Sequence, residues 1–324
     1  MSEIILSITI PTFNRCNELK KNLAAIYPQI QNRNVELIVS DNASTDGTEE
    51  YMKDFTREHP EVRYYRNNNN LGFDGNFMKC FQYASGKYIY ILGDDDYLQP
   101  GAVESIIEGL RLDPIVLFIN RDKIGKKAEK KSIRSEMLPD CNYIIKDKNI
   151  ALKEVGVNIT FISTLIIRNE FIEDYTNLEN YFGSYFIFAY GVFQTMNREG
   201  IYVINTFDCI HPSANDKVSY DLYYVWFESY RKLLFEGGKL GGINESTIVE
   251  VYRTSLKKSL FWFVCHFRNS CDNAYTWNES YLRKNVKQFK DIYWVYFLLL
   301  KCPKPFLKVY YQLGRVYFRF LCRK

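Results

Sequence analysis

The chain has 324 residues, a formal net charge of +4 and an aromatic content of 16%, with 26 tyrosines and 23 phenylalanines. A chain of this length can bury a sizeable core, so one large domain with an appendage is the starting expectation. The small net charge does not by itself imply nucleic-acid binding, and the eight cysteines contain no Cys-x-x-Cys pair of the kind that zinc sites use.

The cysteines and the apolar stretches favour a cytoplasmic protein. Several cysteines lie inside apolar runs, which favours reduced thiols over a disulfide framework. Residues 4–10 are apolar but short, and Ser7 and Thr9 interrupt them, so we expect a first strand and no signal peptide. The longest later apolar run, 292–300, falls well short of the ~20 residues needed to span a bilayer.

Strand and helix patterns alternate over roughly the first 115 residues. The expected strands are 4–10, 35–40, 62–66, 88–92 and 115–119, and the expected helices are 18–26, 48–57, 76–84 and 102–110. This alternation predicts an α/β fold with a mostly parallel sheet that helices cover on both faces. In such sheets, ligands bind outside the carboxyl ends of the strands.

Three polar stretches follow the first, second and fourth strands, so we expect them at one edge of the sheet. They are 11–15 (PTFNR), 41–48 (DNASTDGT) and 93–96 (GDDD). The three adjacent acids disfavour one another's ionisation, and a hard divalent cation bound by carboxylate oxygens relieves that cost. Each stretch also has a plain structural explanation, and for the acidic triplet the alternative is a solvated turn before a helix that begins near Pro100.

Four spaced blocks, SITIPTFNR (7–15), ELIVSDNASTDGT (36–48), NLGFDGN (70–76) and ASGKYIYILGDDDYL (84–98), closely resemble glycosyltransferase family 2. The resemblance implies a GT-A type fold and the transfer of a sugar from a nucleotide donor, with a UDP-sugar as the first candidate. Nucleotidyltransferases, which have a related sheet, would show a Gly-rich loop after the first strand, where this chain has Pro11 and Thr12.

The resemblance also assigns roles to residues of these blocks. Thr12 and Asp41 fall where the family contacts the uracil or another base, and Asp95 lies near the ribose. Asp96, with Asp94, occupies the D-x-D position that holds Mg²⁺ or Mn²⁺ against the donor diphosphate, although three acids compete for two roles. The expected donor-binding residues are Pro11, Thr12, Asn14, Asp41, Asn42, Gly72, Asp94 and Asp95.

The acceptor half carries weaker signals. Residues 121–140 are rich in Lys and Arg, which is typical of a solvated surface loop, and the alternative is a phosphate-binding flap. Residues 160–168 are expected to form a strand that resembles the family's acceptor-side strand. Inverting enzymes of the family carry a carboxylate base downstream, often as Glu-Asp, but here Asn180 follows Glu179. The candidates are Glu173, Asp174 and Glu179, and we prefer Glu179, which opens an aromatic helical stretch.

Two further features of this region have alternative interpretations. His211 follows an expected strand at 202–206, where some GT-A enzymes place an additional metal ligand, and the alternative is an ordinary turn histidine. Residues 236–244 (EGGKLGGIN) are Gly-rich but lack the strand that precedes a phosphate-binding loop, so we expect a flexible connection.

The chain changes character near its C-terminal end, where helical patterns begin at about Thr247. Between Arg283 and Lys324 there are eleven basic residues, interleaved with aromatic ones, and a single acid, Asp291. This mixture suits helices in the headgroup region of an anionic membrane, with Trp294, Tyr296 and Phe297 buried in the interface. The alternative is a helical subdomain that packs its aromatic residues on the core. No RNA or DNA motif accompanies the charge, so nucleic-acid binding is not expected.

These signals predict a GT-A catalytic domain over 1–220, with a nucleotide-sugar-binding half (1–120) and an acceptor half (121–220), followed by a C-terminal helical region (221–324). The expected activity is metal-dependent, inverting transfer of a sugar to a lipid-linked bacterial surface glycan, at the cytoplasmic face of the membrane. One alternative is a transferase that acts on a soluble glycan or protein, and another is a catalytically silent sugar-nucleotide sensor at the membrane surface.

Overall fold

The computed structural model describes residues 3–121, 136–137, 142–171, 175–211, 221, 223–270 and 279–321. Most of the basic stretch 121–140 lies outside these residues, as do the alternative bases Glu173 and Asp174. In the described part, the strands form one mixed sheet in the order β3-β2-β1-β4-β9-β6-β10-β8-β7, and β5 pairs with β10.

The N-terminal half of this sheet is parallel throughout. Its strands, in sheet order, are β3 (Arg63–Arg66), β2 (Val35–Asp41), β1 (Leu6–Thr12) and β4 (Tyr88–Ile91). The helices that alternate with them are α1 (Cys16–Ile30), α2 (Thr48–Glu58), α3 (Gly72–Tyr83) and α4 (Ala102–Leu110). The predicted α/β fold class is therefore confirmed.

The second half of the sheet mixes directions. β9 (Leu165–Arg168) lies antiparallel between β4 and β6 (Val116–Arg121), and β10 (Tyr202–His211) is parallel to β6. The remaining strands are antiparallel to a neighbour and are β5 (Tyr97–Leu98), β7 (Glu136–Met137) and β8 (Asn142–Ile145).

Two expected strands in this half have the wrong length. The strand predicted over 160–168 begins only at Leu165, because residues 156–160 and 162–164 form 3₁₀ turns. The strand predicted over 202–206 continues to His211. Register shifts after Asn205 bend β10 relative to β6, and its last two residues then pair with β5.

Alternating side chains of the central strands supply two apolar cores, one on each face of the sheet. Tyr88 and Tyr90 of β4 face a core that contains apolar residues of α1 and α4, whereas Ile89 and Ile91 face the other core. That second core is built by α3, by α7 (Ile187–Met196) and by the C-terminal helices. The period of two along β4 therefore places helices on both sides, as the sequence predicted.

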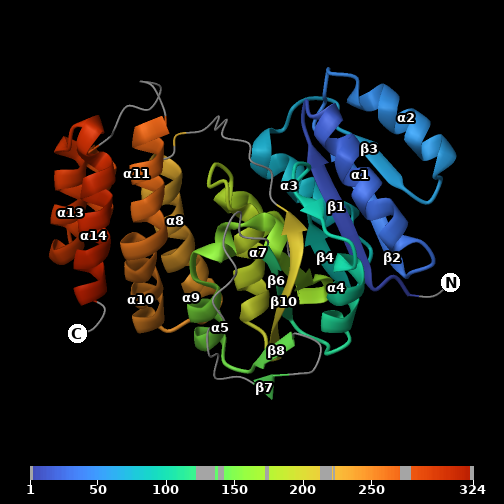
Figure 1. Cartoon of the computed structure of the whole chain (residues 1–324). Coiled ribbons are helices and arrows are strands. Elements are labelled where there is room, and N and C mark those ends of the chain that lie inside the picture. Colours follow the sequence, from blue (N-terminus) through green and yellow to red (C-terminus); the bar gives the residue numbers. More distant parts are fainter. Residues whose placement is uncertain are drawn as a thin grey trace.

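The C-terminal region is helical and extends this second core away from the sheet. A stretch of α-helix and π-helical turns over 223–240 is followed by α10 (Glu245–Ser255), α11 (Phe261–Ser270), α12 (Glu279–Val286), α13 (Lys290–Lys301) and α14 (Leu307–Leu321). In Figure 1, α13 and α14 lie side by side at the opposite end of the molecule from β2 and α2. Among the described residues, no helix is both long and apolar enough to cross a bilayer.

Tyr296 corrects part of the prediction for this region. Its ring is fully buried and its hydroxyl donates to the carbonyl of Leu256 at 2.6 Å, so it packs on the core and is not available to a membrane. Trp294, two residues earlier on α13, is 57% exposed. A helix rotates about 100° per residue, so neighbours in one aromatic run point in different directions.

The Gly-rich stretch 236–244 is not the flexible connection that its composition indicated. Gly237 and Gly238 lie inside the helical stretch and are buried. A Cβ atom at Gly237 would lie 2.5 Å from the Phe193 ring, and one at Gly238 would lie 2.6 Å from Ile248. These glycines serve close helix packing, which a sequence pattern does not distinguish from a loop.

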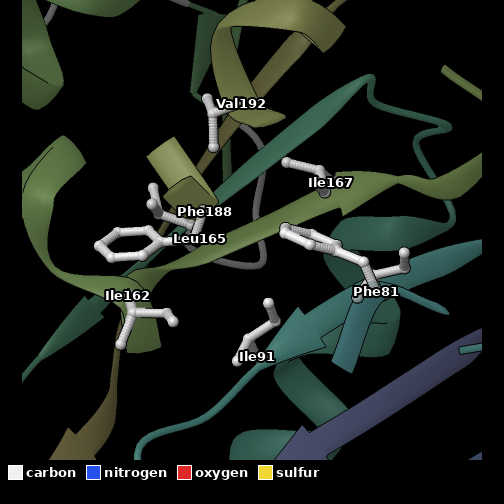
Figure 2. Close-up of a pocket in the computed structure, with 8 residues that line it drawn as sticks. Phe81, Ile91, Ile162, Leu165, Ile167, Phe188 and Val192 are labelled. Atoms are coloured by element: carbon white, nitrogen blue, oxygen red, sulfur yellow. The ribbon is translucent and has the colours of Figure 1, made fainter. Parts of the chain in front are cut away.

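A small apolar cavity lies on the α7 side of the sheet. Figure 2 shows Phe81, Ile91, Leu165 and Phe188 among the side chains that surround it. Its volume is about 10 Å³, enough for at most one water molecule, and its lining offers that molecule no polar side chain. It is a packing void in the core and cannot hold a nucleotide.

Candidate active site

The carboxyl ends of β1, β2 and β4 bring the three predicted polar stretches together. Thr12, the last residue of β1, pairs with Asp41, the last residue of β2. On the other side of β1, Leu92 donates its N–H to the carbonyl of Thr9 at 2.9 Å, so the segment after β4 leaves the sheet beside Thr12. Pro11 is buried one residue before this edge.

The first two acids of the triplet are tied to the segment that follows β1. Thr12 Oγ1 donates to Asp94 Oδ2 at 2.8 Å. Arg15 Nη1 lies 3.2 Å from Asp94 Oδ1 and 2.6 Å from Asp95 Oδ2, so one guanidinium faces two carboxylates. The Arg15 side chain is 37% exposed, whereas Asp94 is almost completely buried. A single, accessible cation therefore faces two carboxylates and can offset the charge of only one of them.

Asp94 has an unusual protonation equilibrium. Burial, and to a smaller extent the neighbouring Asp95, raise the pKa of its carboxyl to about 7, against the opposing effect of the Arg15 charge. A buried carboxylate with a neighbouring acid favours a second cation or a proton. This electrostatic setting fits a cation-binding role for the triplet.

Asp96 is positioned from a different part of the chain. Ser163, just before β9, donates to Asp96 Oδ2 at 2.5 Å and accepts the N–H of Gly93 at 2.9 Å. A Cβ atom at Gly93 would lie 3.0 Å from Asp96 Oδ2, so a larger residue would crowd this carboxylate. Asn22 of α1 donates to the Gly93 carbonyl at 2.9 Å, which fixes the same turn from the other side.

The segments after β1 and β2 are joined by Asn14. Its N–H donates to Ser44 Oγ at 2.9 Å, and its Oδ1 accepts the N–H of Thr45 at 2.8 Å. Asn14 has a positive φ of 53°, a conformation that asparagine tolerates better than most residues. The exposed Asn14 is thus held at the rim of the site by the second segment.

The side chain of Asp41 lies below the surface of the candidate site. It is fully buried, with Oδ1 accepting the Ser44 N–H at 2.9 Å and Oδ2 accepting the Tyr64 hydroxyl at 2.8 Å. Arg66 Nε lies 3.6 Å from Oδ2. The role of Asp41 in donor binding stays a prediction, and this geometry favours an indirect role in which Asp41 shapes the segment after β2.

Asn42 connects that segment to the start of α3. Its Nδ2 donates to Asn70 Oδ1 at 2.8 Å and to the Gly72 carbonyl at 3.1 Å, and its Oδ1 accepts the Leu71 N–H at 2.8 Å. Gly72 is exposed and has a φ of 74°, which a residue with a Cβ atom adopts only under strain. Asn42 and Gly72, both predicted to bind the donor, are thereby in contact.

His211 lies at the expected edge but does not complete a metal cluster. It pairs with Tyr97 across β10 and β5, and Tyr97 directly follows Asp96, so the backbone brings His211 to the neighbourhood of the triplet. In the part of the chain that the structure describes, no group of three or more His, Cys, Asp or Glu side chains is arranged to hold a metal ion. The assignment of Asp96, Asp94 and His211 as ligands stays a prediction.

Glu179 lies on a short turn that α3 holds in place. It is exposed and opens a 3₁₀ turn over Glu179–Tyr181, and the helix expected to start here begins only at Ile187. Asp74 of α3, itself buried, accepts the N–H of Gly183 at 2.7 Å and that of Tyr185 at 3.2 Å. The candidate base is therefore tethered to the block that also carries Gly72.

The sequence interpretation missed three residues that organise this region: Arg15, Ser163 and Asp74. Arg15 and Asp74 lie inside the family-like blocks 7–15 and 70–76. The acidic triplet has no basic residue close to it in sequence, which is a reason to look for a basic partner such as Arg15 elsewhere in the chain. Ser163 gave no sequence signal, because only the fold brings it beside Asp96.

The chain is similar in sequence to several known proteins. The family model described as Glycosyl transferase family 2 matches residues 7–193. Abequosyltransferase RfbV of Salmonella typhimurium is 31% identical over 182 residues, which are 52% of this chain and 54% of that protein. GalNAc(5)-diNAcBac-PP-undecaprenol beta-1,3-glucosyltransferase of Campylobacter jejuni is 34% identical over 104 residues, 32% of this chain and 33% of that protein. The chain thus spans about half and a third of these two relatives.

Solved structures share the fold over nearly the whole chain. TarS of S. aureus, residues 1–349 in complex with UDP-GlcNAc, gives a TM-score of 0.60 at 14% identity and covers 97% of this chain and 89% of that chain. Mannosyltransferase PcManGT from Pyrobaculum calidifontis, in complex with GDP-Man and Mn²⁺, gives a TM-score of 0.53 at 13% identity, with 98% and 86% covered. At these identities the likeness concerns the fold alone.

Proposed function

The chain belongs to glycosyl transferase family 2, and from that premise we propose that it transfers a sugar from a nucleotide-linked donor, first of all a UDP-sugar, to a glycan acceptor. The observation that carries this proposal is the acidic triplet at the end of β4, with Asp94 bonded to Thr12 of β1 and Asp96 bonded to Ser163. The complexes of TarS with UDP-GlcNAc and of PcManGT with GDP-Man lend support through the shared fold.

The acidic side chains at this edge are of the type that binds a divalent cation. The triplet offers carboxylate oxygens, which Mg²⁺ and Mn²⁺ prefer, and Asp94 is buried with a raised pKa that a cation would lower. We propose that Asp96 and Asp94 hold the ion, with His211 as a further ligand. When bound there, such an ion would act as a Lewis acid, and its positive charge would stabilise the leaving diphosphate.

The chain's own residues position the substrates. Thr12, Asn14 and Asn42 line the edge where the donor nucleotide is expected, and Asp41 shapes that edge through Ser44. Glu179 would take the proton from the acceptor hydroxyl as the hydroxyl oxygen bonds to the anomeric carbon. The bond from that carbon to the donor phosphate oxygen breaks, and its electron pair leaves with the nucleoside diphosphate. Attack opposite the leaving group inverts the anomeric configuration.

The acceptor we propose is a lipid-linked bacterial surface glycan, met at the cytoplasmic face of the membrane. The name of one relative, GalNAc(5)-diNAcBac-PP-undecaprenol beta-1,3-glucosyltransferase, supports this acceptor class. The proposal includes the division into a catalytic domain over 1–220 and a helical region over 221–324. Two alternatives are a soluble glycan or protein acceptor and a catalytically silent sugar-nucleotide sensor, which the absence of a Glu-Asp pair at Glu179 keeps open.

A donor screen tests the proposal. The purified chain is incubated with UDP-, GDP- and TDP-sugars, with Mn²⁺ or EDTA, and with or without undecaprenyl-diphosphate-linked glycan, and released nucleoside diphosphate is measured. Release that requires both the cation and the lipid-linked acceptor supports the proposal. Donor binding without release under any condition would favour the sensor.

A further inference from the structure

The surface of α13 and α14 that faces away from the core is apolar. Among the described residues, these two helices and the short turn between them (Lys304–Phe306) carry seven of the fourteen large apolar side chains that are exposed. We call the surface formed by six of them the outer face, and its residues are Trp294, Leu298, Phe306, Val309, Leu313 and Val316. Each is at least 50% exposed, and Leu313 reaches 64%. Isolated apolar residues are ordinary on a protein surface, but a contiguous group is not.

The outer face is not needed to attach α14 to the protein, because a second apolar stripe does that. Leu307 and Phe318 are buried, and the Phe318 ring lies 5.2 Å from the ring of Phe261 in α11. Gly314 permits the close approach, since a Cβ atom there would lie 2.3 Å from the Phe261 ring. Val309, Leu313 and Val316 follow a spacing of four and three residues on the other side of the helix.

Hydrogen bonds join α13 and α14 into an antiparallel hairpin. The Tyr310 hydroxyl donates to the carbonyl of Val295 at 2.6 Å, and the Tyr317 hydroxyl donates to the carbonyl of Asp291 at 3.4 Å. On α13, Trp294 and Leu298 lie opposite the buried Ile292 and Leu299. The two helices lie side by side (Figure 1), and each carries exposed apolar residues on the side away from its buried ones.

Basic side chains border the outer face. Lys308 and Arg315 are exposed and seven residues apart, so they lie along one flank of α14. On α13, exposed Lys290 and Lys301 stand at either end of the stripe formed by Trp294 and Leu298. The single acid of these two helices, Asp291, is ion-paired with Arg253 of α10 at 2.6 Å, so its charge is already compensated.

We propose that the outer face of α13 and α14 docks on an anionic lipid surface. This inference rests on the proposed function, and it names the surface through which the enzyme would meet a membrane that carries its acceptor. The apolar side chains would enter the boundary between headgroups and acyl chains, while the lysine and arginine side chains would bind lipid phosphates. A second copy is a poorer occupant, because pairing this face with itself brings rows of like charge together.

The test uses the full chain and sedimented vesicles of phosphatidylcholine with or without phosphatidylglycerol. Binding should require phosphatidylglycerol and should fall steeply towards roughly 0.5 M salt, because the Debye length shrinks to a few Å. Each base near the lipid surface is expected to strengthen binding about five-fold, so the double variant Lys301→Glu and Lys308→Glu should weaken it by well over ten-fold. The charge-matched control is Lys21→Glu with Lys239→Glu, two exposed lysines elsewhere, which should bind as the wild type does.

The apolar part is tested by Leu313→Asn, with Ile150→Asn as the matched control. Ile150 is 48% exposed on α5 (Lys148–Val155), so the same change there alters surface polarity without touching the outer face. Leu313→Asn should reduce vesicle binding several-fold and leave the melting temperature unchanged, whereas Ile150→Asn should change neither vesicle binding nor the melting temperature.

Two results would overturn the inference. One is the absence of vesicle binding at low salt, and the other is a concentration-dependent dimer that Leu313→Asn abolishes while vesicles never sediment the chain. Donor binding is measured on the same samples by nucleotide titration. If the unmodified chain binds donor but never binds vesicles, only the docking surface is refuted, whereas vesicle binding without any donor binding refutes only the proposed function.

Discussion

Arg15 Nη1 lies 2.6 Å from Asp95 Oδ2 and reaches Asp94 as well, so an arginine supplies the positive charge at the place where a divalent cation is proposed. Two cations close together repel each other, so binding of the ion should require Arg15 to shift. The side chain is more than a third exposed and has room to do so.

Arg15→Gln should therefore change the response to Mn²⁺. Without metal, the variant should lose about 1 kcal/mol of stability, because two carboxylates lose their partner. With Mn²⁺ it should gain more in melting temperature than the wild type, since no side chain competes for the acids. Thermal unfolding at pH 8, above the pKa of about 7 of Asp94, measures both effects. Arg33→Gln, which removes an ion pair with Glu104 away from the site, is the control, and equal Mn²⁺ shifts in Arg15→Gln and wild type would contradict the argument.

Asp96→Ala should abolish turnover and Mn²⁺-dependent donor binding while the protein stays folded. Ser163→Ala should have a smaller effect, a loss of roughly 10- to 100-fold in metal affinity, because Ser163 only orients the carboxylate. Titration of Mn²⁺ in the presence of UDP measures the series. Full activity of Asp96→Ala, or activity undiminished by EDTA, is incompatible with the metal role.

Asp41→Asn should weaken donor binding more than it slows the chemical step, because contacts on the nucleotide side are present in both the ground state and the transition state. The burial of Asp41 adds a second expectation. If it acts by shaping its segment, Tyr64→Phe, which removes one hydrogen bond to the same carboxylate, should weaken donor binding in the same direction. A large fall in maximal rate at unchanged donor affinity would contradict the first expectation, and an unaffected Tyr64→Phe would contradict the second.

Periodic patterns predicted much of the N-terminal half of this fold. α4 has the expected bounds, Ala102–Leu110, because its apolar residues repeat with helical spacing between clear stop signals. α3 starts at Gly72, four residues earlier than expected. The prediction began the helix too late because Gly72 and Gly75 have low helix propensity. The errors increase where tertiary packing decides, as with buried Gly237 or the inward-facing Tyr296.

In the candidate site, too, some residues were predicted from the sequence pattern, whereas others are brought there only by the fold. The residues that follow strands, Thr12, Asp41 and the acidic triplet, were predicted to share an edge because the order of parallel strands fixes where their ends lie. The partners that hold them are distant in sequence. Ser163 is 67 residues from Asp96, and Asp74 is 109 residues from Gly183, so no local pattern could reveal either contact.

Glu36 should make stability depend on acid pH. Its carboxyl is buried in β2, which raises the pKa, but hydrogen bonds from Ser7, Ser85 and Arg63 outweigh burial and lower the pKa below its ordinary value of 4.5. A depressed pKa in the folded state stabilises the protein above the unfolded pKa, and this contribution is lost as pH falls through the folded pKa. Glu36→Gln should thus cost about 1–3 kcal/mol at pH 7 and progressively less below about pH 4. Urea unfolding of both proteins from pH 3 to 7 checks this, and a constant difference across that range would refute it.

Glu179→Gln should remove catalysis and keep donor binding, because the amide is nearly isosteric but cannot accept the proton of the acceptor hydroxyl. A fall of at least about 100-fold in maximal rate is expected, since general bases contribute 10²- to 10⁴-fold. Glu170→Gln, at an exposed glutamate that pairs with Arg168, is the matched control and should be near wild type.

Asp74→Ala extends the test, because it frees the Gly183 and Tyr185 N–H groups and should displace the turn that carries Glu179. If Glu179 is the base, Asp74→Ala should lower the maximal rate with little change in donor affinity, and it should add no further loss in the Glu179→Gln background. Additive losses in the double variant, or full activity of Glu179→Gln, would assign the base to another residue.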